Sequence, residues 1–128
     1  MRVDAALLCR AVEDTPEGLD IFGAAPIRLI RRDSLPAVLE TVVVAFISGT
    51  GLDLERGQSL DVVILDPGLR EIATCPTAIG PLTPTSRGEE QFLMWHWQIS
   101  FTATTAGRHA IDLRHAGETR ATLWLDVG

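Results

Sequence analysis

Histidines are the residues of this sequence best suited to acid–base catalysis or metal binding. His96 lies within EQFLMWHWQISF (90–101), and His109 and His115 begin and end HAIDLRH. A zinc site needs several ligands about 2 Å from one ion, whereas an extended strand would hold His109 and His115 roughly 20 Å apart. A hydrolase would need one histidine beside a serine and a carboxylate. We therefore expect ordinary surface or boundary histidines and no metal site.

Other reactive groups lack the spacing that their chemistry requires. Cys9 and Cys75 occur in no C-x-x-C pair and have no histidine nearby, which argues against a thiolate catalyst. The stretch GTGLDLERG (49–57) does not match the G-x-G-x-x-G pattern of a nucleotide-binding loop, and we expect a loop between strands. No serine occurs in a G-x-S-x-G context. The sequence thus predicts no catalytic residue and no cofactor.

The composition excludes further chemistries. The chain has no Lys, Tyr or Asn, so a lysine Schiff base, a P-loop lysine and a tyrosine acid or base are ruled out. The formal net charge of -6 argues against nucleic acid and against an anionic membrane surface as partners. No apolar run approaches the roughly 20 residues that span a bilayer, and the first residues do not resemble a secretion signal. We expect a cytoplasmic protein with two free thiols.

A fold dominated by strands must position these residues. Short apolar runs are separated by Gly, Pro and Asp at spacings typical of all-β proteins, and helical periodicity is nearly absent. The segment TVVVAFIS (41–48) is apolar on both faces and β-branched, as expected of a central strand. In the turn DPG, Pro67 presets φ and Gly68 allows a positive φ. We predict one domain over 1–128, an antiparallel β-sandwich of about eight or nine short strands.

The last third of the chain reads as a meander of three strands joined by short turns. The predicted strands cover 91–103, 107–115 and 119–127. A tight turn at 105–106 would place the first two strands side by side, with Phe101 next to His109 and Ile99 next to Ile111. Such cross-strand apolar pairs stabilise antiparallel sheets.

The first strand of this meander has two different faces. Period-two alternation gathers bulky apolar side chains on one of them: Leu93, Trp95, Trp97, Ile99 and Phe101. We expect Trp97 and Ile99 in the core and His96 on the opposite face, outside it.

Apolar side chains also fall on faces that should meet water. Phe92 and Met94 flank His96, and Trp124 faces away from its apolar neighbours in the last strand. Two interpretations stay open: the loop 76–90 folds over these side chains, or they form a partner surface. The candidate partner surface therefore comprises Phe92, Met94, His96 and Trp124.

Several segments of the chain resemble a family of short uncharacterised bacterial proteins. These segments are VDAALLCRAVE, GLDIFGA, LDVVILDPG and AGRHAIDLRHAGETRATLWLDV. The last of them is also similar to the final hairpin of many immunoglobulin-like bacterial domains, with His109 where an aromatic residue is usual. The resemblance implies an immunoglobulin-like β-sandwich and brings no functional residue with it.

Three functions remain compatible with these patterns. The leading hypothesis is a non-catalytic binding or assembly module that acts through a sheet face or edge, with another protein or a second copy of the chain as partner. The first alternative is a carrier that holds a small apolar ligand between the sheets, lined by Trp95 and Trp97. The second is a small hydrolase-type enzyme built around one of the histidines.

Overall fold

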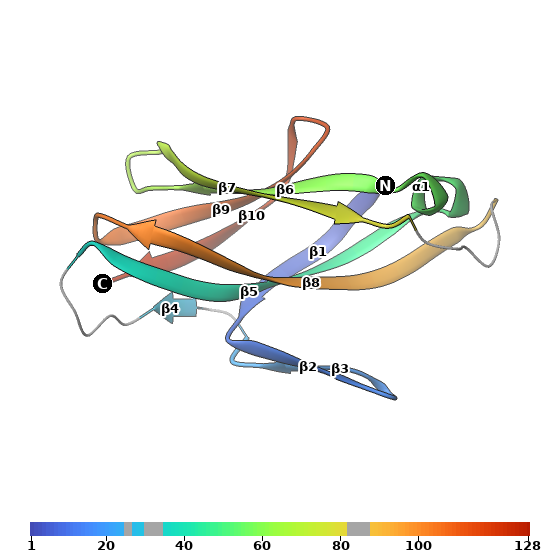
Figure 1. Cartoon of the computed structure of the whole chain (residues 1–128), viewed down its shortest axis with the longest axis horizontal. Coiled ribbons are helices and arrows are strands. Elements are labelled where there is room, and N and C mark those ends of the chain that lie inside the picture. Colours follow the sequence, from blue (N-terminus) through green and yellow to red (C-terminus); the bar gives the residue numbers. More distant parts are fainter. Residues whose placement is uncertain (25–26, 30–34, 82–87) are drawn as a thin grey trace.

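The computed structural model describes residues 1–24, 27–29, 35–81 and 88–128. Within these residues the chain forms ten strands and one short helix, so the all-β prediction is confirmed. Two sheets pack face to face, and a separate two-stranded hairpin lies outside one of them (Figure 1). The described part of the chain includes no helix long and apolar enough to cross a membrane.

The strands are divided between three sheets. The three-stranded sheet has the order β1 (Arg2–Cys9), β5 (Ala37–Thr50), β8 (Glu90–Ala103). The five-stranded sheet has the order β4 (Ile27–Leu29), β10 (Glu118–Val127), β9 (Gly107–His115), β6 (Gln58–Leu65), β7 (Glu71–Ile79). The hairpin consists of β2 (Ala11–Thr15) and β3 (Gly18–Phe22). All described pairings are antiparallel except that of β4 with β10, which is parallel.

The core is the apolar layer between the three-stranded and five-stranded sheets. Its buried members include Leu8, Val43 and Ile47 from the first sheet and Ile64 and Leu113 from the second. Each large apolar side chain removed from water contributes about 1.5–3 kcal/mol. The core therefore holds the two sheets together and leaves one face of each sheet outside.

The central position predicted for 41–48 is confirmed, because β5 lies between β1 and β8. Val43 points into the core, whereas Val42 and Val44 belong to a second buried cluster on the outer face. β-branched side chains favour this extended backbone. A strand that is apolar on both faces thus has apolar layers on both sides.

The predicted meander is correct in its strands and in the antiparallel pairing of 107–115 with 119–127, but wrong in pairing 91–103 with 107–115. β8 pairs with β5 along its whole length, and β9 pairs with β6 and β10. The residues between β8 and β9 therefore carry the chain from one sheet to the other. Phe101 and His109 still meet, but across the interior, with ring centroids 5.9 Å apart. Sequence adjacency favours a hairpin, whereas β5 offers β8 a partner of equal length.

The predicted faces of β8 agree with the structure. Ile99 and Phe101 are buried, and Trp97 packs against the core while remaining half-buried at its rim. His96 lies on the other face, as expected. Because alternation along a strand is a local property, it survives an error in the choice of partner strand.

The stretch expected to be a loop at 49–57 contains the helix α1 (Gly51–Arg56). The hydroxyl of Thr50 accepts a hydrogen bond from the backbone N–H of Asp53, and the Asp53 carboxylate accepts one from the N–H of Thr50. This capping box satisfies N–H groups that a short helix would otherwise leave unpaired. Leu54 is buried and anchors the helix to the sandwich.

In the turn between β6 and β7, the residue with a positive φ is not the one that was predicted. Leu69, and not Gly68, has a φ of 63°. The Asp66 side chain accepts a hydrogen bond from the backbone N–H of Arg70, at 2.9 Å, and holds this conformation. A local hydrogen bond from a side chain can thus stabilise a leucine at a positive φ, a backbone conformation that usually favours glycine.

The β2–β3 hairpin forms a third layer over the three-stranded sheet. Val12, Leu19 and Ile21 of the hairpin pack on a buried cluster of Cys9, Val42 and Val44. The hairpin therefore covers part of the outer face of this sheet, which we had expected to meet solvent or a partner protein. The expectation that 76–90 covers this face is not confirmed: β7 extends to Ile79 in the other sheet, and 82–87 lie outside the described residues.

Candidate functional site

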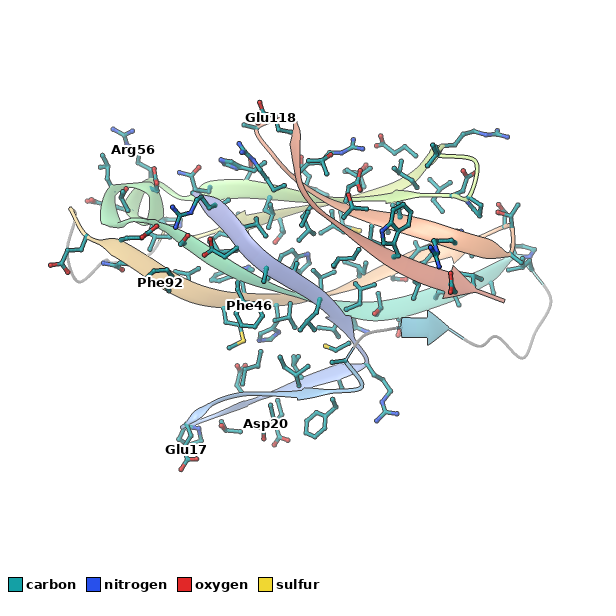
Figure 2. The ribbon with its side chains drawn as sticks, turned by 180° about the vertical axis from the view of Figure 1, so that it is seen from behind. Glu17, Asp20, Phe46, Arg56, Phe92 and Glu118 are labelled. Atoms are coloured by element: carbon teal, nitrogen blue, oxygen red, sulfur yellow. The ribbon has the colours of Figure 1, made fainter. Side chains whose placement is uncertain are left out.

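The outer face of the three-stranded sheet is only partly covered by the hairpin. Beyond the hairpin, Phe46, Phe92 and Met94 remain at the surface, and we call these three residues the apolar shelf. Phe92 is 73% exposed and Met94 38% exposed. Figure 2 shows Phe46 and Phe92 on the side of the molecule from which the hairpin projects. Strand register explains the grouping, because Phe46 of β5 pairs with Met94 of β8.

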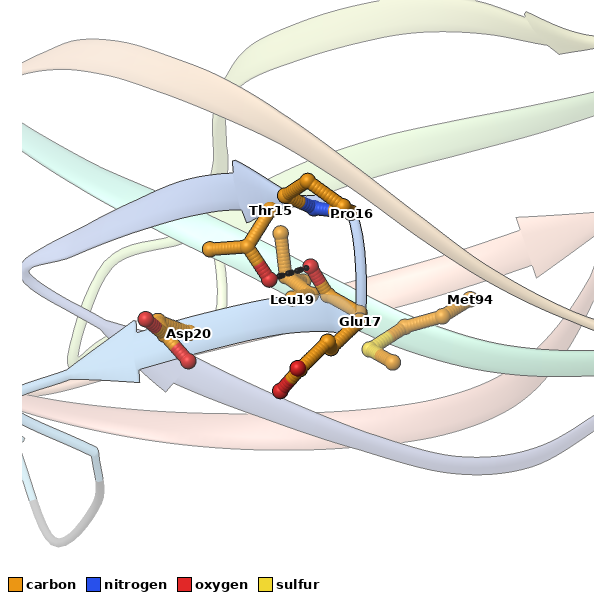
Figure 3. Close-up of a pocket in the computed structure, with 7 residues that line it drawn as sticks. Thr15, Pro16, Glu17, Leu19, Asp20 and Met94 are labelled. Atoms are coloured by element: carbon orange, nitrogen blue, oxygen red, sulfur yellow. Dashed lines mark hydrogen bonds between the residues drawn. The ribbon is translucent and has the colours of Figure 1, made fainter.

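Three hollows adjoin the shelf, and Met94 lines all of them. The first, of about 420 Å³, lies over Phe46, Phe92 and Asp4. The second, of about 620 Å³, lies under the hairpin turn and is drawn in Figure 3. The third, of about 240 Å³, lies between Asp14, Leu19 and His96. A methionine is flexible and can adapt to different occupants, and Met94 is common to all three hollows.

The hairpin turn forms one wall of the second hollow. The Thr15 hydroxyl donates a hydrogen bond to the backbone carbonyl of Gly18, at 2.9 Å (Figure 3). Glu17 and Asp20 line the hollow beside Leu19 and Met94. The hollow is therefore acidic on the hairpin side and apolar on the sheet side.

His96 is the only histidine that the structure places next to a carboxylate within ion-pair distance among the described residues. Its Nε2 lies 3.5 Å from an oxygen of Asp14 on β2. The two hollows that His96 lines contain no serine, threonine or cysteine. The pair has no adjacent nucleophile in these hollows, and its evident effect is to link the hairpin to β8. Sequence reasoning missed Asp14 because nothing local connects the two positions.

Trp124 does not belong to the same surface as Phe92, Met94 and His96. It lies on β10, on the outer face of the five-stranded sheet, where it is 53% exposed. The Arg108 guanidinium lies 6.0 Å from the centroid of its ring. The two sheets separate Trp124 from the apolar shelf, so the four predicted surface residues divide between opposite sides of the molecule.

The prediction of a surface or boundary position is wrong for His109. Its side chain is fully buried beside Phe101, with Nδ1 3.1 Å from the carbonyl oxygen of Gly107. Alternation along β9 puts His109 on the same face as Ile111 and Leu113, which is the core face. His115, at the other end of β9, is half-buried, with its Nδ1 2.8 Å from the carbonyl oxygen of Ser59. The described residues contain no group of three or more side chains suited to holding a metal ion.

The hairpin is strongly acidic. Between Ala11 and Phe22 it carries four carboxylates and no cationic side chain: Glu13, Asp14, Glu17 and Asp20. Asp14 pairs with His96, and the other three have no ion-pair partner within the described part of the chain. Uncompensated carboxylates beside an apolar surface attract groups of positive charge.

Both cysteines are free, and their surroundings differ. Cys9 is buried under the hairpin, and this burial raises the pKa of its thiol, although a backbone hydrogen bond from Ala11 opposes the shift. Cys75 is half-buried on β7, the edge strand of its sheet.

We expect Cys75 to react with a thiol reagent at least roughly tenfold faster than Cys9 in the native protein, because the thiolate form and its access both control the rate. A time course with Ellman's reagent, with the Cys75→Ser variant to assign the phases, measures both rates. Equal rates would contradict the burial of Cys9.

Comparison with known proteins places the chain in no family. No family model and no curated protein sequence matches it. Two crystal structures of a β-glucosidase from Listeria innocua show a weak structural likeness. The complex with glucose has 14% sequence identity and a TM-score of 0.39, and the complex with isofagomine has 15% and 0.38. Each match covers 97% of this chain and only 16% of the enzyme chain, and likenesses this weak do not bear on activity.

Proposed function

We propose that this chain is a non-catalytic binding or assembly module of the bacterial cytoplasm, and that it binds another protein through the apolar shelf. The observation that carries the proposal is that Phe92 and Met94, two exposed apolar side chains, line the same hollow on the outer face of the three-stranded sheet. Exposed apolar groups that adjoin one another are a common mark of protein interaction sites. The shelf lies on rigid paired strands, which favours a preformed surface.

We further propose an immunoglobulin-like topology for the sandwich. In immunoglobulin lettering, β1, β5 and β8 correspond to strands A, B and E of one sheet, and β10, β9 and β6 to G, F and C of the other. The chain departs from antibody domains in having no inter-sheet disulfide between its cysteines and in carrying the β2–β3 hairpin. Membership of the short bacterial family rests on the sequence segments alone.

The geometry gives less support to the two alternatives. A carrier would need a cavity between the sheets lined by Trp95 and Trp97. Both side chains pack against the buried core, and Trp95 also lines the hollow beside His96, which lies outside the three-stranded sheet. A hydrolase would need a nucleophile beside His96 and Asp14, and the hollows that His96 lines supply none. The binding module needs neither feature.

The test replaces the exposed shelf side chains in the double variant Phe92→Ser/Met94→Ser. We expect a partner retained on the immobilised wild-type protein to bind the double variant at least about tenfold more weakly, because core interface contacts carry most binding energy. Val38→Ser is the matched control, since Val38 is exposed at the other end of β5. Multi-angle light scattering of the same proteins measures self-association. Unchanged retention and unchanged mass in the double variant would refute the proposed surface.

A further inference from the structure

We infer that the occupant of the apolar shelf is a segment of another protein that combines basic and apolar side chains. This inference rests on the proposed function and specifies the chemistry of its partner. The argument depends on how apolar groups and carboxylates are distributed around Met94.

Each of the three hollows that Met94 lines also contains at least one carboxylate. Glu17 and Asp20 line the hollow under the hairpin turn, and Asp14 lines the one beside His96. Asp4 lines the hollow over Phe92, where its carboxylate also lies 3.5 Å from the side chain of Arg2. An apolar side chain inserted into any of these hollows would bring its neighbours close to negative charge. A ligand with cations next to its apolar groups therefore complements the whole surface.

Net charge favours a different protein over a second copy of this chain. Between Ala11 and Phe22 the hairpin has four carboxylates and no cation, so two hairpins facing each other would repel. The opposite outer face carries Arg108, Arg114 and Arg120, but each is within ion-pair distance of a carboxylate of its own sheet. That face has no evident surplus of positive charge to offer to the hairpin of another copy.

The negative net charge of the whole chain supports the same conclusion. All eleven of its cationic side chains are arginines, against seventeen acidic residues. Basic partners are attracted to such a protein over several ångströms and more strongly at low ionic strength. The local concentration of unpaired carboxylates on the hairpin would direct them to the shelf.

The experiment measures binding of a fluorescein-labelled peptide of alternating lysine and leucine by fluorescence anisotropy. The variant Asp14→Asn/Glu17→Gln/Asp20→Asn removes three hairpin carboxylates. The matched control, Glu71→Gln/Glu118→Gln/Asp126→Asn, removes the same charge from the five-stranded sheet; Glu118 lies opposite the hairpin (Figure 2). We expect the hairpin variant to bind about tenfold more weakly than wild type and the control to change less than about twofold. Added salt should weaken the wild-type complex.

If the hairpin variant and the control weaken peptide binding equally, the binding reflects only a general attraction of cations to an acidic protein. That result would overturn the inference. A peptide with glutamate in place of lysine should not bind, and equal binding of the two peptides would also overturn it.

The shelf variant Phe92→Ser/Met94→Ser separates this inference from the proposed function. If it abolishes peptide binding while the hairpin variant binds as wild type does, the shelf is a docking surface and the basic chemistry is wrong. If the shelf variant changes neither peptide binding nor partner retention, both proposals fail. A wild-type dimer that the shelf variant converts to monomer would identify a second copy as occupant and overturn the inference.

Discussion

Replacing Phe101 with alanine is expected to lower the free energy of unfolding by about 3–5 kcal/mol, as do other large-to-small substitutions in packed cores. Phe101 is 4% exposed, and its ring lies against the ring of His109 across the interior of the sandwich. Its removal leaves a cavity between two sheets that are held by long paired strands and cannot easily close around it. The loss is a large share of the roughly 5–15 kcal/mol that stabilises a domain. Equilibrium unfolding in urea measures it.

Phe92→Ala is the matched control, because it removes the same side chain from the other face of the same strand. Phe92 is 73% exposed, so we expect a loss below about 1 kcal/mol. If Phe92→Ala were the more destabilising of the two, the register of β8 would be wrong by one residue, and every face along the strand would be exchanged.

The second large effect concerns the attachment of the hairpin. We expect Ile21→Asp to raise the labelling rate of Cys9 by at least roughly a hundredfold, which corresponds to about 2.7 kcal/mol of lost docking free energy. Ile21 packs on the cluster that contains Cys9, and a carboxylate placed there would have to be buried without a partner. The hairpin would instead leave the sheet and expose the thiol. The measurement is the Ellman time course, with Cys75→Ser as background.

Phe22→Asp is the control for this experiment. Phe22 follows Ile21 directly, is exposed, and points to the other side of the hairpin, so the same charge there should leave Cys9 protected. Thermal unfolding of Ile21→Asp should remain cooperative, because the main core does not include the hairpin. If the labelling rate of Cys9 in Ile21→Asp were the same as in the parent protein, the attachment of the hairpin would not depend on Ile21.

Most residues of the candidate site could be singled out from the sequence, but the sequence did not show which of them lie together. Phe92 and Met94 stood out because they are apolar at positions that alternate with a core face, and both are exposed. His96 was on the expected face, but its partner Asp14 was missed. The acidic character of the hairpin could have been read from its composition, since no cation occurs between Ala11 and Phe22.

Two misjudged local elements show which signals were available. The helix at Gly51–Arg56 has its signal in Thr50 and Asp53, three positions apart, which is the spacing of a capping box. The turn at Leu69 had no such signal, because an aspartate side chain and not a glycine stabilises its positive φ. The turn at 116–117 was recognisable, and both Ala116 and Gly117 have positive φ there.

The sequence by itself determined the all-β class and, in the last third of the chain, the strands and their faces. Alternation and β-branched runs are properties of neighbouring residues, so the strands 107–115 and 119–127 and the core face of Ile99 and Phe101 could be predicted without knowing the fold.

Only the tertiary structure decided which strands lie side by side and what covers each face. β8 pairs with β5 and not with β9, the hairpin covers Cys9, and Trp124 lies on the opposite side from Phe92. The physical reason is that the apolar side chains on a strand face predict that the face is buried, but they do not specify which other surface buries it. Several pairings satisfy the same local pattern, and the choice among them depends on closing the whole sandwich at once.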